Sequence, residues 1–265
     1  MLGKLEIRVR SMRHSVSGPS LIENLELGLA PQSVASLLGP SGIGKTTLLR
    51  IIAGLERRFD GQILLDMAEI AKPTRDVQLV FQDYRLLPWK TAYENIRFAG
   101  RQNSNDSHDR AEEWLNFVGL ASRRDAWPKT LSGGEAGRVA FARAFVDQPK
   151  VLLLDEPFSG LDIVTKRALQ EQLLRALTKQ PATVLMVSHS VEDAVFMSDS
   201  IHVLTPSPMG IARTFSVDLP RPRDPASREF LETVGEITAF VAGDTRQHVQ
   251  GARRFDDRAR MVARG

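Results

Sequence analysis

The nine-residue run GPSGIGKTT, residues 39–47, limits the possible folds of this chain more than any other segment. It follows a short apolar run, SVASLL, and opens a stretch with helical spacing, KTTLLRIIAG, that ends at Gly54. The run fits the pattern G-x-x-x-x-G-K-[ST] in the strand–loop–helix context that the pattern requires. Its glycines let backbone N–H groups turn inward around an anion, and the helix N-terminus adds partial positive charge. We therefore expect a phosphate-binding loop consisting of Gly39, Pro40, Ser41, Gly42, Ile43, Gly44, Lys45, Thr46 and Thr47.

Strand-like and helical segments alternate along most of the chain. Strand patterns occupy residues 4–10, 21–29, 33–39, 61–70, 76–82, 150–156, 182–189 and 200–205. Residues 85–148 lack such patterns and read as a helical insert, and a further helix is expected over 163–180. This alternation predicts an α/β fold with a mostly parallel sheet. We expect one domain over 1–220, followed over 221–265 by a proline-broken linker, a short helix and a basic tail.

The composition excludes several classes of protein. The chain has no cysteine, which removes disulfides and thiolate metal sites. Its apolar runs are far shorter than the roughly 20 residues that a membrane-spanning helix needs. The 265 residues carry a formal net charge of +3. This slight basic excess would suit nucleic acid, but residues 85–148 show no sustained heptads of a long coiled coil, so we expect no nucleic-acid partner.

Polar residues gather where the predicted strands end. Asp155 and Glu156 close the apolar run VLLLDE, His189 closes VLMVSH, and Gln82 closes QLVFQ. Open α/β sheets bind ligands beyond the carboxyl ends of their strands. Asp155 is therefore expected to hold Mg²⁺ with the Thr46 hydroxyl, and Glu156 to orient or deprotonate an attacking water. His189 can hydrogen-bond the γ-phosphate, and the Gln82 amide can reach metal or water while its loop leads into the insert.

These motifs resemble, in order, those of the nucleotide-binding subunit of an ABC transporter. The resemblance covers about residues 4–220 and includes VFQD, LSGGE, LLLDEPFSGLD and VSHSVEDA besides the phosphate loop. It implies a P-loop NTPase fold with a mostly parallel core sheet, a small antiparallel β subdomain and a helical subdomain. It also implies ATP and Mg²⁺ as ligands. The matched residues are Lys45 for the phosphates, Thr46, Gln82 and Asp155 for the metal, Glu156, His189 and Gln82 for catalysis, and Asp162 in SGLD.

The LSGGE segment, residues 131–135, is an unusual helix start because two adjacent glycines stand where a helix favours alanine. Ser132 and Glu135 form an S-x-x-E capping box. In the family that the chain resembles, this segment closes over the ATP of the opposite subunit, so a homodimer is implied. Ser132, Gly133 and Gly134 would then approach the γ-phosphate, where side chains would block the approach.

The sequence departs from the family pattern in two places. Glu135 stands where glutamine is usual, and Ala136 and Gly137 stand where polar residues follow. The added negative charge would weaken closure or raise the ATP requirement. The aromatic residue that usually stacks on adenine is also missing from RSMRHSVSG, where His14 is the best candidate.

The segments LLPWKTAYENI and VLTPSPMGI…VDLPRPRDP resemble those of nitrate, sulfonate and taurine importers. Trp89 in LLPW is expected at the tip of an exposed apolar loop that binds the permease, although local burial is the alternative. The resemblance implies a membrane permease, an extracytoplasmic solute-binding protein, and a place on the cytoplasmic face of the cell membrane. A soluble scaffold ATPase, a DNA-repair or chromosome ATPase, and a subunit that binds ATP without cleaving it are the alternatives.

Overall fold

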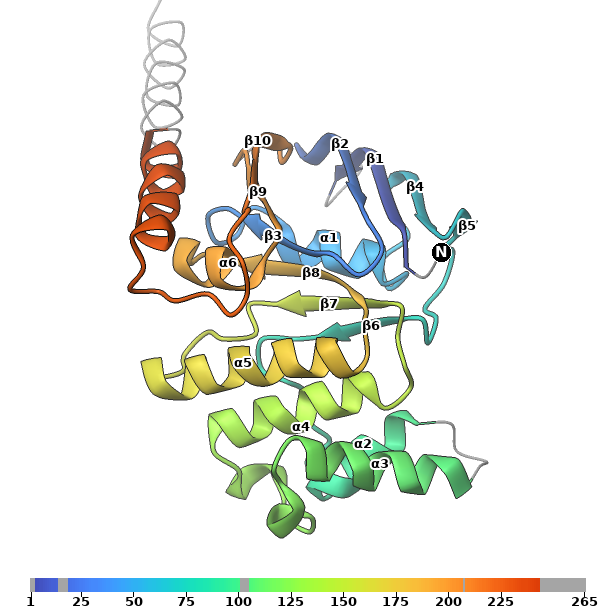
Figure 1. Cartoon of the computed structure of the whole chain (residues 1–265). Helices are drawn as coiled ribbons and strands as arrows, with labels where there is room; N and C mark the ends of the chain where they lie inside the picture. Colours follow the sequence, from blue (N-terminus) through green and yellow to red (C-terminus); the bar gives the residue numbers. More distant parts are fainter. Residues whose placement is uncertain (1–2, 14–18, 101–104, 207, 244–265) are drawn as a thin grey trace, which may run out of the picture.

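The computed structural model describes residues 3–13, 19–100, 105–206 and 208–243. Two β-sheets and a set of helices make up this part of the chain (Figure 1). The six-stranded sheet has the order β10-β9-β3-β8-β7-β6, and the four-stranded sheet has the order β2-β1-β4-β5. The predicted fold class, an α/β fold with a mostly parallel core sheet and a small antiparallel sheet, is confirmed.

The six-stranded sheet forms the core because its central strands are apolar on both faces. It contains β3 (Val34–Leu38), β6 (Val77–Val80), β7 (Val151–Asp155), β8 (Thr183–Ser188), β9 (Ser200–Leu204) and β10 (Ile211–Ser216). Every residue of β3, β7 and β8 is buried, as expected for parallel strands that are covered on both sides. All neighbouring pairs are parallel except β9 with β10, so the carboxyl ends of β3, β6, β7 and β8 lie at one edge.

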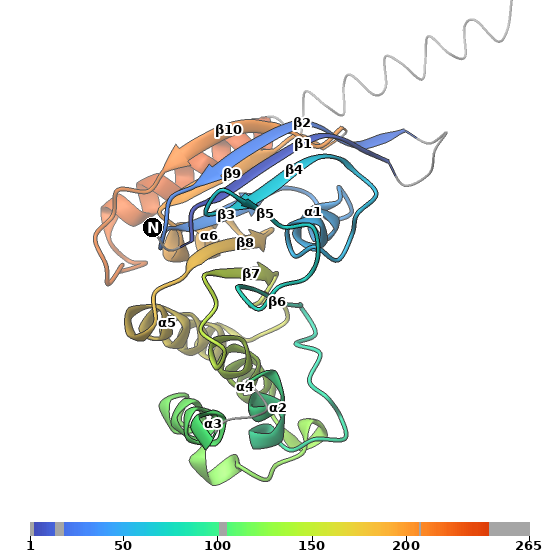
Figure 2. The ribbon, with the colours of Figure 1, turned by 90° about the vertical axis from the view of Figure 1, so that its right-hand side faces the viewer.

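The antiparallel sheet covers the first helix. It consists of β1 (Leu5–Arg13), β2 (Ser20–Leu29), β4 (Asp60–Leu65) and β5 (Ala68–Glu69). Inward residues of β1, such as Leu5, Ile7 and Val9, share a hydrophobic cluster with the apolar side of α1 (Lys45–Ile52). Figure 2 shows α1 between this sheet and the central strands. The phosphate loop is thereby held by strands on one side and by a packed helix on the other.

Between β6 and β7, the regular secondary structure of the described residues is entirely helical, and it lies at the lower end of the molecule in Figure 1. They are α2 (Ala92–Ala99), α3 (Asn105–Phe117), η1 (Ala121–Arg123), η2 (Pro128–Thr130) and α4 (Gly133–Phe145). Trp114 of α3 stacks on Phe145 of α4 with ring centroids 5.1 Å apart. The helix α5 (Ile163–Lys179) lies between this group and the sheet and contacts α4.

Two elements near the end of the chain were not expected from the sequence. The strand β10 has only one buried residue, Phe215, so its pattern lacks the alternation that marks a strand. The short helix α6 (Val191–Met197) comes two residues after His189.

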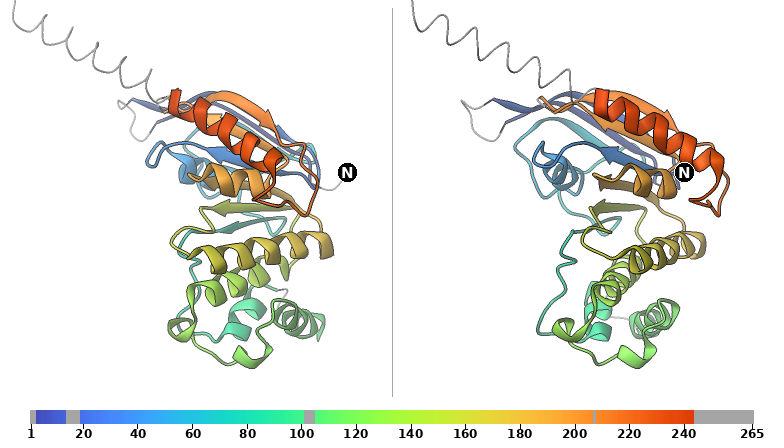
Figure 3. Two further views of the ribbon diagram at one scale, coloured as in Figure 1. Left: turned by 60° about the vertical axis from the view of Figure 1, so that its left-hand side comes forward. Right: turned by 90° about the vertical axis from the view of Figure 1, so that its left-hand side faces the viewer.

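Residues 228–243 form a helix along β9 and β10 (Figure 3), where Phe240 meets Phe215 edge to face at 5.6 Å.

The proline-rich segment before this helix is tied to the fold by Arg223. Its buried guanidinium donates to five carbonyl oxygens, among them those of Val195, Phe196 and Ser198 at the end of α6.

Across the described ranges, no helix is both long enough and apolar enough to cross a membrane. The division of the chain at residue 220 and the nature of the basic tail stay predictions, and the tail lies outside the described residues.

Candidate functional site

The phosphate loop joins β3 to α1 through two residues in left-handed backbone conformations, Gly42 at φ 84° and Gly44 at φ 104°. A side chain at either position would be strained, and one at Gly44 would also collide with Leu21. Lys45 is 5% exposed, and its ammonium donates to the carbonyl oxygens of Gly39 at 2.8 Å and Pro40 at 2.7 Å. Burial lowers the pKa of Lys45, although the carboxylates of Glu156 and Asp155 oppose this. The loop therefore holds a buried cation beside a glycine-lined turn.

Thr46 and Asp155 meet at the mouth of this loop. The Thr46 hydroxyl donates to Oδ1 of Asp155 at 3.1 Å, which links the start of α1 to the end of β7. Asp155 is 7% exposed, and burial raises its pKa, with Glu156 adding to the rise while Thr46 and Lys45 oppose it. Hydroxyl and carboxylate oxygens are the donors that Mg²⁺ prefers. Nowhere in the described ranges do three or more His, Cys, Asp or Glu residues cluster as a metal site, so nucleotide and water would supply the other oxygens.

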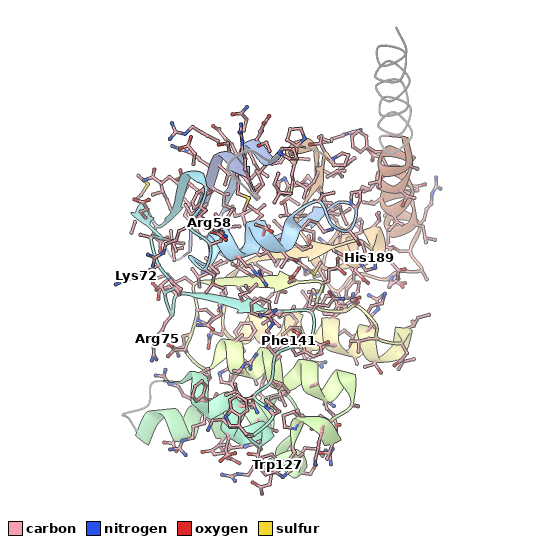
Figure 4. All side chains as sticks on the ribbon, turned by 180° about the vertical axis from the view of Figure 1, so that it is seen from behind. Arg58, Lys72, Arg75, Trp127, Phe141 and His189 are labelled. Carbon is pink, nitrogen blue, oxygen red and sulfur yellow. The ribbon has the colours of Figure 1, made fainter. Side chains whose placement is uncertain are left out.

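Glu156 and His189 are joined directly. Glu156 has a left-handed backbone, φ 47°, and its N–H donates to the carbonyl oxygen of Val187 in β8. This turn directs its side chain to the next strand's end, where Oε2 lies 3.0 Å from Nδ1 of His189. The histidine side chain is 56% exposed, and Figure 4 shows His189 beyond the ends of the central strands. A carboxylate held by an imidazole at an open sheet edge is an arrangement suited to orienting a water molecule.

Gln82 lies exposed after β6, at the same edge of the sheet. Its amide donates to the hydroxyl of Ser159 at 3.4 Å, a long hydrogen bond that leaves the side chain free to take other partners. Ser159 also closes a turn through its N–H to the carbonyl oxygen of Glu156. The structure thus brings Gln82 close to the turn that carries Glu156. No sequence pattern indicated Ser159 as part of this site.

The LSGGE segment forms the predicted capping box at the start of α4. The Ser132 hydroxyl accepts from the N–H of Glu135 at 3.2 Å, and Glu135 Oε2 accepts from the N–H of Ser132 at 2.8 Å. The other carboxylate oxygen pairs with Nε of Arg123 at 3.1 Å. That partner lies twelve residues away, and nothing in the sequence pattern indicated it.

Packing within the chain itself also favours glycine at both positions of this segment. A Cβ at Gly134 would lie 2.5 Å from Cγ2 of Thr165, and one at Gly133 would lie 3.0 Å from Cδ2 of Leu161. The sequence analysis explained these glycines only by the approach of a nucleotide. The close contact with the start of α5 is a second and independent reason for them.

Asp162 and His14 differ in how the structure places them. Asp162 caps α5, since its Oδ1 accepts from the N–H groups of Val164 and Thr165 at 3.1 and 3.0 Å. A role toward a nucleotide across a subunit interface is not tested by these contacts. His14, the candidate for adenine stacking, lies outside the described residues.

One chain does not bring the LSGGE segment to its own phosphate loop. Figure 1 shows α1 in the upper part of the molecule and α4 in the lower part, below β6 and α5. Trp127, close before the segment, lies at the far end from the sheet in Figure 4. Among the described residues, no hydrogen bond or ion pair joins residues 132–134 to residues 39–47.

Comparisons with known proteins agree with this arrangement. The family described as ABC transporter matches residues 22–159. An aliphatic sulfonates import ATP-binding protein, SsuB, of Xanthomonas axonopodis pv. citri is 43% identical over 79% of this chain and 84% of its own length. An ABC transporter ATP-binding protein of Methanocaldococcus jannaschii is 43% identical over 80% of both chains.

Two solved structures show the same fold. A dimeric ATP-binding cassette, bound to ADP and Pi in a post-hydrolysis state, superimposes with a TM-score of 0.69. It is 25% identical, and the match covers 82% of this chain and 100% of that one. The cbiO1 protein of Clostridium perfringens gives a TM-score of 0.73 at 23% identity over 82% and 90% of the chains, which supports the fold alone. The chain therefore belongs to the ABC transporter family, as one of the ATP-binding ATPase subunits of that family.

Proposed function

We propose that this subunit hydrolyses ATP to power an importer for nitrate, sulfonate, taurine or a similar small solute. The relatives named as aliphatic sulfonate import proteins, at 38–43% identity, support a sulfonate within this group. The observation that carries the ATPase assignment is the chain of contacts along one sheet edge. It runs from Thr46 to Asp155 and from Glu156 to His189, directly beside the buried Lys45.

In the proposed mechanism, the loop N–H groups and Lys45 bind the β- and γ-phosphates of ATP. Thr46 and Asp155, with Gln82, would hold Mg²⁺, which neutralises charge that develops on the phosphates when it is bound. Glu156 orients the attacking water and takes up its proton. His189, which contacts the Glu156 carboxylate in the structure, would hydrogen-bond the γ-phosphate once ATP is bound.

A second copy of the chain would complete each site. Ser132 and Gly133 are exposed at the N-terminus of α4. Anions are favoured at such a terminus, because its first N–H groups have no partners within the helix. In a head-to-tail pair, the segment 132–134 of each subunit would cover the γ-phosphate bound by the other. The dimeric state of the related cassette bound to ADP and Pi supports this assembly.

Trp89 is the proposed contact with the permease. Its side chain is 68% exposed at the tip of the loop between β6 and α2, and Phe98 of α2 is 51% exposed. Exposed apolar patches often mark the surface that binds a partner. A permease bound here would place the subunit at the cytoplasmic face of the membrane, in a system that also includes an extracytoplasmic solute-binding protein.

The decisive experiment compares Glu156→Gln with the parent chain. The variant is expected to bind ATP with unchanged affinity, to lose turnover, and to accumulate as an ATP-bound dimer in size-exclusion chromatography. Turnover at the parental rate would show that Glu156 is not the base. Trp89→Ala is expected to weaken co-purification with the permease while ATP affinity is retained, and undiminished co-purification would contradict the docking proposal.

A further inference from the structure

Tyr84, two residues after Gln82, holds a strained position in the segment that leaves β6. Tyr84 and Arg85 both have left-handed backbones, with φ 56° and 45°. Non-glycine residues adopt this conformation only where the surroundings enforce it. Here Arg143 of α4 enforces it, since its guanidinium donates to the carbonyl oxygens of Tyr84 at 2.6 Å and Arg85 at 2.7 Å.

The Tyr84 side chain connects this segment to the turn after Glu156. It is 8% exposed, and its hydroxyl donates to the carbonyl oxygen of Pro157 at 2.9 Å. Burial raises the pKa of Tyr84 to about 12, so the hydroxyl keeps its proton at neutral pH. The same turn also contacts α4, because Phe158 meets Phe141 edge to face at 6.4 Å. Figure 4 shows Phe141 between the sheet and the helical part.

Gly137 leaves the space that Tyr84 occupies. A Cβ at position 137 of α4 would lie 3.0 Å from both Cζ and the hydroxyl oxygen of Tyr84. It would also lie 2.7 Å from Cδ2 of Leu169. Glycine is disfavoured inside a helix, so its presence at this buried position calls for a packing reason. The Tyr84 ring and the Leu169 side chain, both packed against the bare backbone of α4, supply that reason.

We propose that Tyr84 is a positioning residue for ATP hydrolysis. Its side chain fills the space left by Gly137 and joins three segments into one unit: the segment after Gln82, the turn that carries Glu156, and the helix α4. The proposal rests on the roles proposed above for Glu156 and Gln82. Its consequence is mechanical: displacement of α4, which begins at the LSGGE segment, displaces the catalytic turn with it. Tyr84 acts through Glu156 and does not touch the nucleotide.

The test is Tyr84→Phe in the full-length chain, because it removes one hydroxyl and keeps the ring. We expect kcat to fall about fivefold, the effect of one lost hydrogen bond to a buried carbonyl, while KM stays within about twofold. The control is Tyr93→Phe, which removes the only other tyrosine hydroxyl in the chain, from a 5% exposed side chain in α2. Unchanged kcat in Tyr84→Phe, or an equal loss in Tyr93→Phe, would overturn the proposal.

A double-mutant cycle tests the contribution of Gly137. Gly137→Ala is expected to lower kcat in the parent chain. In the Tyr84→Ala background, where the contact is gone, the factor by which Gly137→Ala lowers kcat should be at least about threefold smaller. Equal effects in both backgrounds would contradict the coupling of the two residues. Glu156→Gln, measured in parallel, separates the two proposals. If it abolishes turnover while Tyr84→Phe leaves kcat intact, only the positioning role fails; if it retains turnover, the assignment of the base fails.

Discussion

The charge of Glu135 gives the sharpest quantitative prediction. Glu135 stands at the helix start that would face the partner's ATP, where an unpaired carboxylate would repel the γ-phosphate. Its oxygens are both engaged, by the N–H of Ser132 and by Arg123, and these contacts lower its pKa. Arg123 is further held by its bond to the carbonyl oxygen of Thr130. We predict that Arg123 offsets the charge of Glu135, and that Arg123→Gln therefore weakens ATP-dependent dimerisation.

The exposure of the pair sets the size of this effect. The side chains of Arg123 and Glu135 are 38% and 21% exposed, so solvent screens much of their attraction. Without Arg123, an uncompensated Glu135 carboxylate would face the partner's γ-phosphate, and a screened repulsion of this kind costs about 0.5–1 kcal/mol at each site. Because a symmetric dimer contains two such sites, the total is about 1–2 kcal/mol, or a dimerisation constant roughly 5- to 30-fold weaker.

The assay is sedimentation equilibrium with saturating ATP in the Glu156→Gln background, which prevents turnover. Arg123→Gln should weaken dimerisation when Glu135 is present and have no effect when Glu135→Gln is also present. Arg124→Gln is the control, since Arg124 pairs with Glu112 and Asp125 and makes no contact with the LSGGE segment. An equal loss with and without the Glu135 charge would refute the reasoning, as would no loss at all.

Three further predictions concern single side chains. Lys45→Ala should lower ATP affinity at least about tenfold, because a buried charge that faces the phosphates is lost, and equilibrium titration with a fluorescent nucleotide measures this. Since burial raises the pKa of Asp155, its ionised carboxylate disfavours folding; the contribution of the protonated group is complete below 3.8 and is lost as the pH rises through the folded-state pKa. Nucleotide-free Asp155→Asn should therefore melt no lower than the parent at pH 7–8 and lose stabilisation by ATP with Mg²⁺; a lower melting temperature without nucleotide would contradict this. Burial lowers the pKa of His202 from 6.5 to about 4. The stabilisation by the neutral side chain is therefore complete above pH 6.5 and is lost as the pH falls toward 4. Between those pH values the parent should lose about 3 kcal/mol more than His202→Asn, as measured by urea unfolding, and parallel pH curves would refute it.

The strands that were predicted correctly carry the pattern in their own residues: β1 and β2 alternate between apolar and polar residues, and the fully buried strands are continuous apolar runs. The segments 33–39, 150–156 and 182–189 became β3, β7 and β8, since a parallel strand that is buried on both faces is a nearly continuous run of apolar residues. The segment 61–70 became the hairpin β4–β5, with Asp66 and Met67 in left-handed conformations at its turn. By contrast, β10 could not be predicted, because its pairing with β9 does not depend on an apolar pattern of its own.

The site divides in the same way. Lys45, Thr46, Asp155, Glu156 and His189 could be named from the sequence, because the phosphate loop and the strand ends that precede these residues meet at one edge of any parallel sheet. Their partners could not be named. Arg123 reaches Glu135 from a separate turn, and no local spacing encodes such a pair.

What the sequence alone determined is the order of the motifs, the phosphate loop and the class of the sheet, because each depends on residues that are neighbours along the chain. The tertiary structure decided which side chains lock these pieces together. The hydroxyl of Tyr84 reaches Pro157, 73 positions away, and Gly137 makes room for it from a third segment. Such contacts arise from the packing of α4 against the sheet. Their physical basis is steric fit between distant segments, which leaves no periodic trace in the sequence.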